Sequence, residues 1–413
     1  MSKSTRNSKK IHPHTFHKVK GVGVYLDYAS SALSQSANPG AIHELGVKEK
    51  NKLENARKKI AKILRARSDE IIFTSGATES NNLAILGLVK DLKKPHIITT
   101  NIEHASVLEV CRHLESLPAG RPGTKRATVT YVEVERSGIV DVKKIKKALT
   151  KNTVLVSVIY ANNEIGTIQP IKEIAKEIRH YNKINNKKIF FHTDATQAVN
   201  YLPVNVSKLG VDLLSFNSAK IYGPKGIGVL YVKKNTPITK IMFGGDQERG
   251  LRPGTENVIG AVALASTLEI TEKIKNREVI RLTKLRDYFI RKLNYSTILT
   301  NFRIAINGDL KNRLPNNINI TIPNIPSELL VIELSAKGIM ASAKSACKSG
   351  NGKVSHVIQA IRQAPLARTV LANGAEEDGS LRFSLGRYTI KSDIDYTVKT
   401  LSNILTKLKK WYN

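Results

Sequence analysis

The sequence predicts an α/β fold, in which helices cover both faces of a mostly parallel sheet, followed by a smaller α+β region. Between residues 70 and 232, short runs rich in Val and Ile alternate with stretches of helical periodicity. Apolar runs of this kind are typical of parallel strands that are buried on both faces. After residue 270 the alternation gives way to a long amphipathic helix and a few short strands. A chain of 413 residues is long enough for two or three domains.

The first region accounts for most of the predicted strands. We expect strands at 24–28, 70–74, 96–100, 128–132, 155–160, 190–194, 211–216 and 227–232. Helices are expected at 41–65, from 77 to about 89, and at 106–117, 142–149 and 171–181. Each helix lies between two strands along the chain, which is the order that builds a parallel sheet.

The second region is predicted to be a smaller α+β domain. Its helices are expected at 268–293, 327–337, 354–363 and 392–411, with strands near 304 and at 317–322 and 380–384. The predicted division is a disordered basic arm at 1–20, a large domain at 21–270 and a small domain at 271–413. The arm contains six Lys or Arg, three His and no acidic residue.

Composition indicates an ordinary globular protein with one unusual feature, a net charge of +32. The lysines are spread over polar helix faces without interleaved aromatic residues, so a nucleic acid is not predicted as a dedicated partner. No apolar run approaches the roughly 18 residues that span a bilayer, and no membrane association is expected. The two cysteines, Cys111 and Cys347, form no disulfide framework, so a cytoplasmic location is expected.

A candidate site lies where two neighbouring strands end. Asp194 closes the apolar strand 190–194, and Lys220 follows the strand 211–216 just before a glycine-rich turn. Open α/β sheets bind ligands at the carboxyl ends of their strands. A lysine and an acid there are what pyridoxal 5'-phosphate (PLP) requires, for a Schiff base and for its ring nitrogen. Alternatively, Lys220 is one of 66 Lys and Arg residues on a solvated loop.

The segment 75–78 has the composition of a phosphate-binding turn. It follows a predicted strand directly and leads into a helix, so its backbone N–H groups are available to an anion. A plain N-cap by Ser or Thr is the ordinary alternative, and both readings can hold together.

With these motifs in place, the chain from residue 25 to about 408 resembles the fold-type I PLP enzymes of the class V aminotransferase group. Within that group it is similar to the cysteine desulfurases, and around Ser345-Ala346-Cys347 to their nitrogen-fixation and housekeeping iron–sulfur type. The motifs are YLDYA at 25–29, FTSGATESN at 73–81, NNEIG at 162–166, DATQ at 194–197, KIYGPKGIG at 220–228, QERG at 247–250, GT at 254–255 and RFSLGR at 382–387. The resemblance implies a seven-stranded, mostly parallel sheet in the large domain.

The resemblance also implies roles for individual residues. Lys220 is expected to form the Schiff base, Asp194 to pair with the pyridinium nitrogen, and His104 to stack on the ring and assist proton transfer. Without the resemblance, His104 is more simply the cap of a helix that begins near residue 105. The other implied contacts are Gln197 to the cofactor's phenolic oxygen, Asn163 to cofactor and substrate, Ala77, Thr78, Asn217, Ser218 and the partner subunit's Thr255 to the phosphate, and Arg382 to the substrate carboxylate.

Cys347 is the expected nucleophile. Its segment has no apolar periodicity, and lysines at −3 and +1 favour the reactive thiolate. Cys111 lies within an apolar run and is expected to be buried and inert. No metal site is expected in this chain, although Cys347 could contact a nascent iron–sulfur cluster on a partner.

The implied function is PLP-dependent removal of sulfur from L-cysteine, which gives alanine and a persulfide on Cys347. A homodimer is expected, and the expected sulfur acceptor is an iron–sulfur scaffold, a tRNA-thiolation protein or a cofactor-biosynthesis carrier. Two alternatives remain: a selenocysteine lyase or another PLP lyase of the group, and a catalytically degenerate scaffold or RNA-associated relative.

Several positions depart from the family pattern. Ala219 stands where His usually precedes the lysine, Asn217 where a serine is usual, and Lys344 where a glycine is usual. The stretch between Ala29 and Asn38 is shorter than usual, and the chain stops soon after its last helix. These departures leave Lys220 and Cys347 in place. Ala219 and the shortened N-terminal stretch motivate the degenerate alternative.

Overall fold

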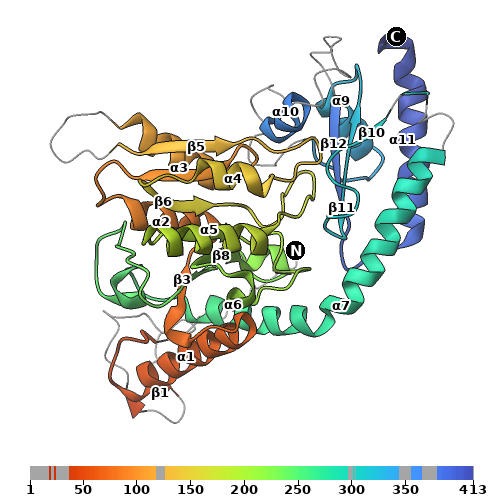
Figure 1. Ribbon diagram of the computed structural model, residues 1–413. Coiled ribbons are helices and arrows are strands. Elements are labelled where there is room, and N and C mark those ends of the chain that lie inside the picture. Colours follow the sequence, from red (N-terminus) through yellow and green to blue (C-terminus); the bar gives the residue numbers. More distant parts are fainter. Residues whose placement is uncertain are drawn as a thin grey trace, which may run out of the picture.

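The larger part of the molecule is built around a seven-stranded sheet (Figure 1). The computed structural model describes residues 18–19, 23–24, 37–117, 126–295, 301–302, 304–343, 355–364 and 379–412. The strands are β3 (Ile71–Thr74), β4 (His96–Thr100), β5 (Thr128–Val132), β6 (Thr153–Ser157), β7 (Phe190–Asp194), β8 (Leu213–Asn217) and β9 (Gly228–Val232). Their order is β3-β9-β8-β7-β6-β4-β5, and only β9 runs antiparallel to its neighbours. The predicted seven-stranded, mostly parallel sheet is therefore confirmed.

Helices cover both faces of this sheet. Successive residues of a strand point to opposite faces. Accordingly Phe190 and Leu213 belong to one apolar cluster, and Phe191 and Leu214 to the other. The first cluster is completed by α2 (Ala77–Val89) and α3 (Ala105–Ser116). The second is completed by α1 (Glu44–Leu64), α4 (Val142–Ala148), α5 (Ile171–Asn185), α6 (Val206–Leu209) and α7 (Val258–Tyr295).

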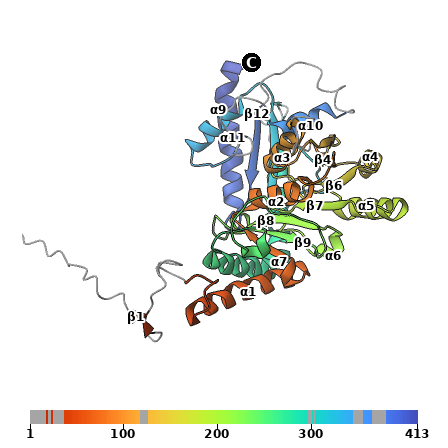
Figure 2. The same ribbon diagram turned by 90° about the vertical axis from the view of Figure 1, so that its left-hand side faces the viewer.

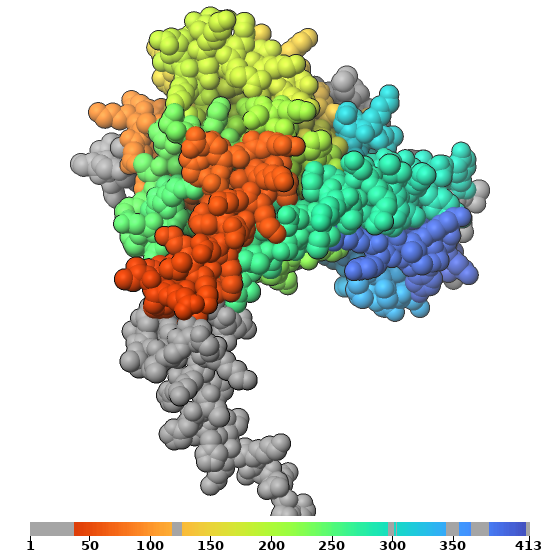
Figure 3. All heavy atoms as spheres, turned by 90° about the horizontal axis from the view of Figure 1, so that it is seen from below, coloured from red at the N-terminus to blue at the C-terminus, as the bar shows by residue number. Residues whose placement is uncertain are grey.

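A second, three-stranded antiparallel sheet lies beyond the large one (Figure 2). Its order is β10 (Ala305–Ile306), β11 (Asn317–Ile322) and β12 (Gly379–Ser384), all at predicted positions. The accompanying helices are α9 (Ser327–Ser335), α10 (His356–Gln363) and α11 (Lys391–Tyr412). The long helix α7 lies beside α1 at one end and beside α11 at the other, so it reaches from one sheet to the second (Figure 3).

Some predicted boundaries were wrong. Helix α7 begins at Val258, ten residues before the predicted start, because Val258, Ala261 and Leu264 form a buried stripe facing the core. Strand β6 ends at Ser157 rather than at residue 160. Lys18–Val19, at the end of the predicted basic arm, pairs as β1 with β2 (Gly23–Val24). No helix in the described part of the chain is long and apolar enough to cross a bilayer.

Candidate active site

Strand pairing brings the β3–α2 turn (residues 75–76) beside the segment that carries Lys220. Thr74 and Asn217 are both register partners of Gly228, on either side of it. A side chain at Gly228 would lie 2.6 Å from the Cα atom of Gly76, so this close approach requires glycine. The first residues of α2 and the 3-10 turn at Ser218–Ile221 therefore lie at one edge of the sheet.

The start of α2 suits an anion. Its N-cap is Gly76, which makes no side-chain capping hydrogen bond, so the alternative of a Ser or Thr cap was wrong. Ala77 is buried and Thr78 is exposed, and both contribute N–H groups to the first turn. The fully buried Ser218 Oγ has no hydrogen-bond partner among the described residues. A buried hydroxyl without a partner is costly, and a phosphate oxygen would satisfy it.

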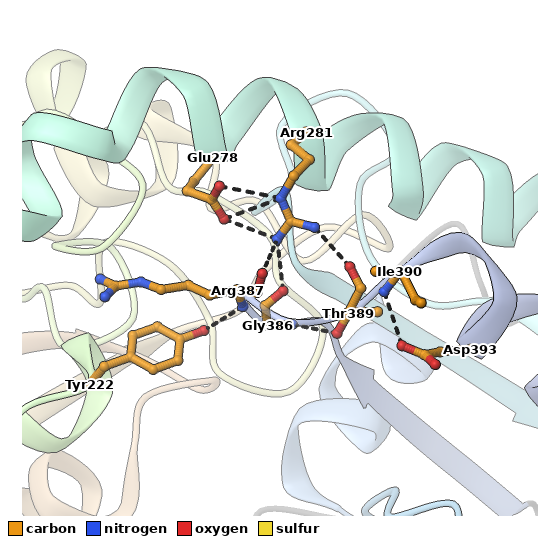
Figure 4. A network of polar contacts seen from close by, with 8 residues as sticks. All are labelled: Tyr222, Glu278, Arg281, Gly386, Arg387, Thr389, Ile390 and Asp393. Carbon is orange, nitrogen blue, oxygen red and sulfur yellow. Dashed lines mark hydrogen bonds and ion pairs between the residues drawn. The ribbon is translucent and has the colours of Figure 1, made fainter.

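Lys220 lies exposed in the turn that follows β8. The Oδ1 atom of Asn217 accepts a hydrogen bond from the Lys220 backbone N–H at 3.2 Å and caps this turn. Asn217 therefore fixes the main chain at Lys220. Two residues later, the hydroxyl of Tyr222 accepts the backbone N–H of Arg387 at 3.0 Å, and the Arg387 guanidinium lies 4.1 Å from the Tyr222 ring centroid (Figure 4).

Asp194 is buried and held by two donors. Its Oδ2 accepts from Asn81 Nδ2 at 2.8 Å, and its Oδ1 accepts from the Thr196 backbone N–H at 2.9 Å. The same amide nitrogen of Asn81 donates to Ser106 Oγ at 2.8 Å, and Ser106 Oγ lies 2.8 Å from His104 Nδ1. A continuous polar path thus joins Asp194 to His104. The motifs alone did not indicate a role for Asn81 or Ser106. The one sign in the sequence was the amide of Asn81 on the buried face of α2.

His104 is the N-cap of α3, as the simpler reading predicted. Its Nδ1 accepts the Ser106 backbone N–H at 3.1 Å. Because a backbone N–H can only donate, Nδ1 is unprotonated and the neutral ring carries its proton on Nε2. The cap therefore fixes both the position and the tautomer of the imidazole, which is compatible with the implied second role.

Two buried ionisable groups surround Asp194. Burial lowers the pKa of His192, against the opposing effect of the Asp194 charge, so this imidazole is neutral between Ser157 Oγ at 2.8 Å and Ser215 Oγ at 3.0 Å. Burial likewise raises the pKa of Glu103 to about 8. His192 and Glu103 therefore add little charge beside Asp194 near neutral pH.

The two residues expected to bind the substrate are brought together. Arg382 Nη1, from β12, donates to the Asn163 carbonyl oxygen at 3.1 Å. Asn317 and Asn319 of β11 donate to the neighbouring carbonyl of Glu164 at 3.0 and 3.2 Å. The second sheet is thus joined to the loop that follows β6.

The segment after β12 is tied to α7 (Figure 4). Arg281 donates to the carbonyl oxygens of Thr389 at 2.7 Å, Gly386 at 2.9 Å and Arg387 at 3.1 Å, and pairs with Glu278 at 2.9 Å. Because these carbonyls lie on the turn directly after β12, Arg281 holds the end of β12, the strand that carries Arg382.

The remaining predicted residues have different outcomes. Gln197 is half-buried and Thr255 is exposed on a separate loop. Cys347 and the motif at 25–29 lie outside the described residues. Cys111 is buried as expected, and burial raises the pKa of its thiol to about 12.

The described residues fit PLP. The α2 N-terminus and Ser218 Oγ offer donors to a phosphate, Asp194 is a buried carboxylate, and Lys220 is an amine at the same edge of the sheet. These groups therefore match the phosphate, the ring nitrogen and the aldehyde of the cofactor, in that order.

Comparison with known proteins agrees with this geometry. The family model for aminotransferase class-V matches residues 22–397. A protein of Dictyoglomus turgidum named cysteine desulfurase IscS is 44% identical over 94% of this chain and 95% of its own length. One of Methanosarcina thermophila with the same name is 41% identical over 90% of this chain and 86% of its own.

Solved structures give the same result. A NifS-like protein is similar with a TM-score of 0.77 and 34% identity, over 90% of this chain and 92% of its own. A structure described as SspA in complex with cysteine has a TM-score of 0.67 and 32% identity, over 88% of this chain and 93% of its own. The chain therefore belongs to the class-V aminotransferase family and, within it, to the cysteine desulfurases.

Proposed function

We propose that this chain is a PLP-dependent cysteine desulfurase that converts L-cysteine to L-alanine and retains the sulfur as a persulfide on Cys347. The observation that carries the proposal is the convergence of Asp194, Ser218 and the α2 N-terminus with Lys220 at one edge of the sheet. The relatives named cysteine desulfurase and the structure solved with cysteine support the choice of substrate.

In this proposal the cofactor, when bound, supplies an electron sink at the substrate's α-carbon. Lys220 would bind it, and Asp194, kept in place by Asn81 and the Thr196 N–H, would pair with its ring nitrogen. His104, whose neutral imidazole carries its proton on Nε2, would stack on the ring, and Arg382 would hold the substrate carboxylate as a bidentate partner. Asn163 supports the substrate through its contact with Arg382.

The sulfur step needs no outside oxidant. The Cys347 thiolate attacks the sulfur of L-cysteine and forms the S–S bond, while the electron pair of the broken C–S bond remains with carbon. That carbon takes up a proton, the product leaves as alanine, and the transferred sulfur stays on Cys347. The persulfide is then available to an acceptor, for which we propose an iron–sulfur scaffold or a tRNA-thiolation protein in a cytoplasmic setting.

We also propose a homodimer. The start of α7 presents an exposed apolar stripe at Ile259, Val262 and Ile270, which are 49%, 37% and 51% exposed. Exposed apolar residues at this spacing on one helix mark an interaction surface. The exposed Thr255 lies just before this stripe and is proposed to reach the phosphate of the other subunit's cofactor.

The test is the Cys347→Ala variant, with Cys111→Ala as the matched control. We expect Cys347→Ala to bind PLP normally and to lose turnover of L-cysteine, because no thiolate remains to take the sulfur. Cys111→Ala should retain turnover, since Cys111 is buried. Full turnover of selenocysteine or cysteine by Cys347→Ala would instead favour a lyase that does not need this residue.

A further inference from the structure

One carboxylate joins the β3–α2 turn to the loop that carries Thr255 (residues 244–257). The Oε2 atom of Glu79 accepts the Ser75 backbone N–H at 2.7 Å, and its Oε1 accepts Arg252 Nε at 3.1 Å. The two side chains are only 15% and 27% exposed, so water screens the pair weakly. Each oxygen of Glu79 therefore serves a different segment of the proposed phosphate site.

A buried ion pair anchors the same loop to α1. Arg57 donates to both carboxylate oxygens of Glu248, at 2.8 and 2.7 Å, and the side chains are 6% and 2% exposed. Glu248 Oε2 also accepts the backbone N–H of Phe73 at 2.8 Å, two residues before the turn. The Thr255 loop is thus anchored on strand β3.

The Thr255 loop is held in an unusual backbone conformation. Glu248 and Arg249 have φ angles of 48° and 61°, which non-glycine residues adopt only when their surroundings hold them there. The Gly254 N–H donates to Gln247 Oε1 at 3.1 Å, directly before Thr255. The position of Thr255 therefore follows from the contacts of Glu248, Gln247 and Arg252.

We propose that Glu79 and Arg252 are positioning residues that couple the two phosphate sites of the dimer. Glu79 links the turn that binds its own subunit's cofactor phosphate to the loop that presents Thr255 to the other subunit. Disturbing this link weakens both sites, because a coupling free energy acts in both directions. The inference rests on the PLP site and the homodimer of the proposed function.

The first experiment measures PLP affinity of cofactor-stripped protein by the absorption of the lysine-bound cofactor. Arg252→Met and Glu79→Gln should each weaken PLP binding by about tenfold. The double variant should weaken it by no more than either single variant, because the same charge-assisted contact is lost in all three. Arg252→Lys should recover part of the affinity. Arg112→Met, which breaks the exposed pair Arg112–Glu109 at 2.7 Å on α3, is the matched control and should bind normally.

The second experiment uses mixed dimers purified through two different tags. One subunit carries Lys220→Ala, so only the other reports the lysine-bound cofactor. In the first arm Arg252→Met lies on the reporting subunit and disturbs the link to its own turn. In the second arm it lies on the Lys220→Ala subunit and disturbs the Thr255 loop that the reporting site receives.

The proposal expects weaker PLP binding in both arms. A defect in one arm alone overturns the coupling, since Arg252 then serves either its own subunit or the other but does not link them. Additive losses in the double variant also overturn it. A wild-type protein that elutes as a monomer or takes up no PLP would overturn the proposed function itself, so the two failures are distinguishable.

Discussion

Glu103 shows how a single buried carboxyl makes stability depend on pH. Its Oε1 accepts from Thr100 Oγ1 at 2.6 Å and from the Ile159 N–H at 2.9 Å, and its Oε2 is buried without a partner among the described residues. Burial raises its pKa from 4.5 to about 8, and the nearby Asp194 charge acts in the same direction. Between these values the folded protein binds more protons than the unfolded chain, so stability falls as pH rises.

The Glu103→Gln variant tests this account. An amide keeps the accepting oxygen but does not titrate, so the fall in unfolding free energy from pH 4.5 to about 8 should become shallower, by at most about 1.4 kcal/mol per pH unit. Urea unfolding across that range measures the slope, with the exposed Glu109→Gln as the control. An unchanged slope in Glu103→Gln would show that Glu103 is ionised in the folded protein.

For individual residues, the sequence predicted the positions of those that belong to recognisable motifs. Asp194 and Lys220 lie where strand ends predict them, and the start of α2 presents its N–H groups as expected. The path through Asn81 and Ser106 could not be predicted, because it depends on which side chains α2 and α3 bring within hydrogen-bond distance. The capping choice at Gly76 was also missed, since side-chain preference alone favours Ser or Thr.

Among the elements, α7 connects the two sheets, and Arg281 is its main contact with the turn after β12 (Figure 4). We expect Arg281→Met to lower the free energy of unfolding by about 1–3 kcal/mol, because three carbonyl oxygens lose their donor. Arg277→Met, on an exposed position of the same helix, should change it by less than about 0.5 kcal/mol. Urea unfolding measures the free energy of both variants. A loss in Arg281→Met as small as that expected for Arg277→Met would mean that the Arg281 contacts contribute nothing.

Apolar runs predicted the strands well, since β4, β5, β7 and β11 have the predicted bounds. The start of α7 was predicted ten residues late, because Gly260 and small alanines dilute the apolar periodicity there. The first turns of α7 pack against α1, and this contact cannot be read from the local sequence.

For the whole molecule, the sequence predicted the fold class and the succession of strands and helices along the chain, and the comparisons place the chain among the cysteine desulfurases. The spatial order of the strands was not predicted. This chain departs from the family pattern at Ala219 and Asn217, which lie at the turn before Lys220. Asn217 still accepts the Lys220 backbone N–H, so the substitution at Asn217 leaves the turn at Lys220 capped. The dimer and the sulfur acceptor stay predictions, since each depends on a second chain.

The most direct test is the visible absorption spectrum of the purified protein and of Lys220→Ala, before and after L-cysteine is added. We predict an absorption band from cofactor bound to Lys220 that shifts with L-cysteine and is missing in Lys220→Ala. A wild-type protein that shows no such band even after incubation with PLP would contradict the assignment of this site as a PLP enzyme.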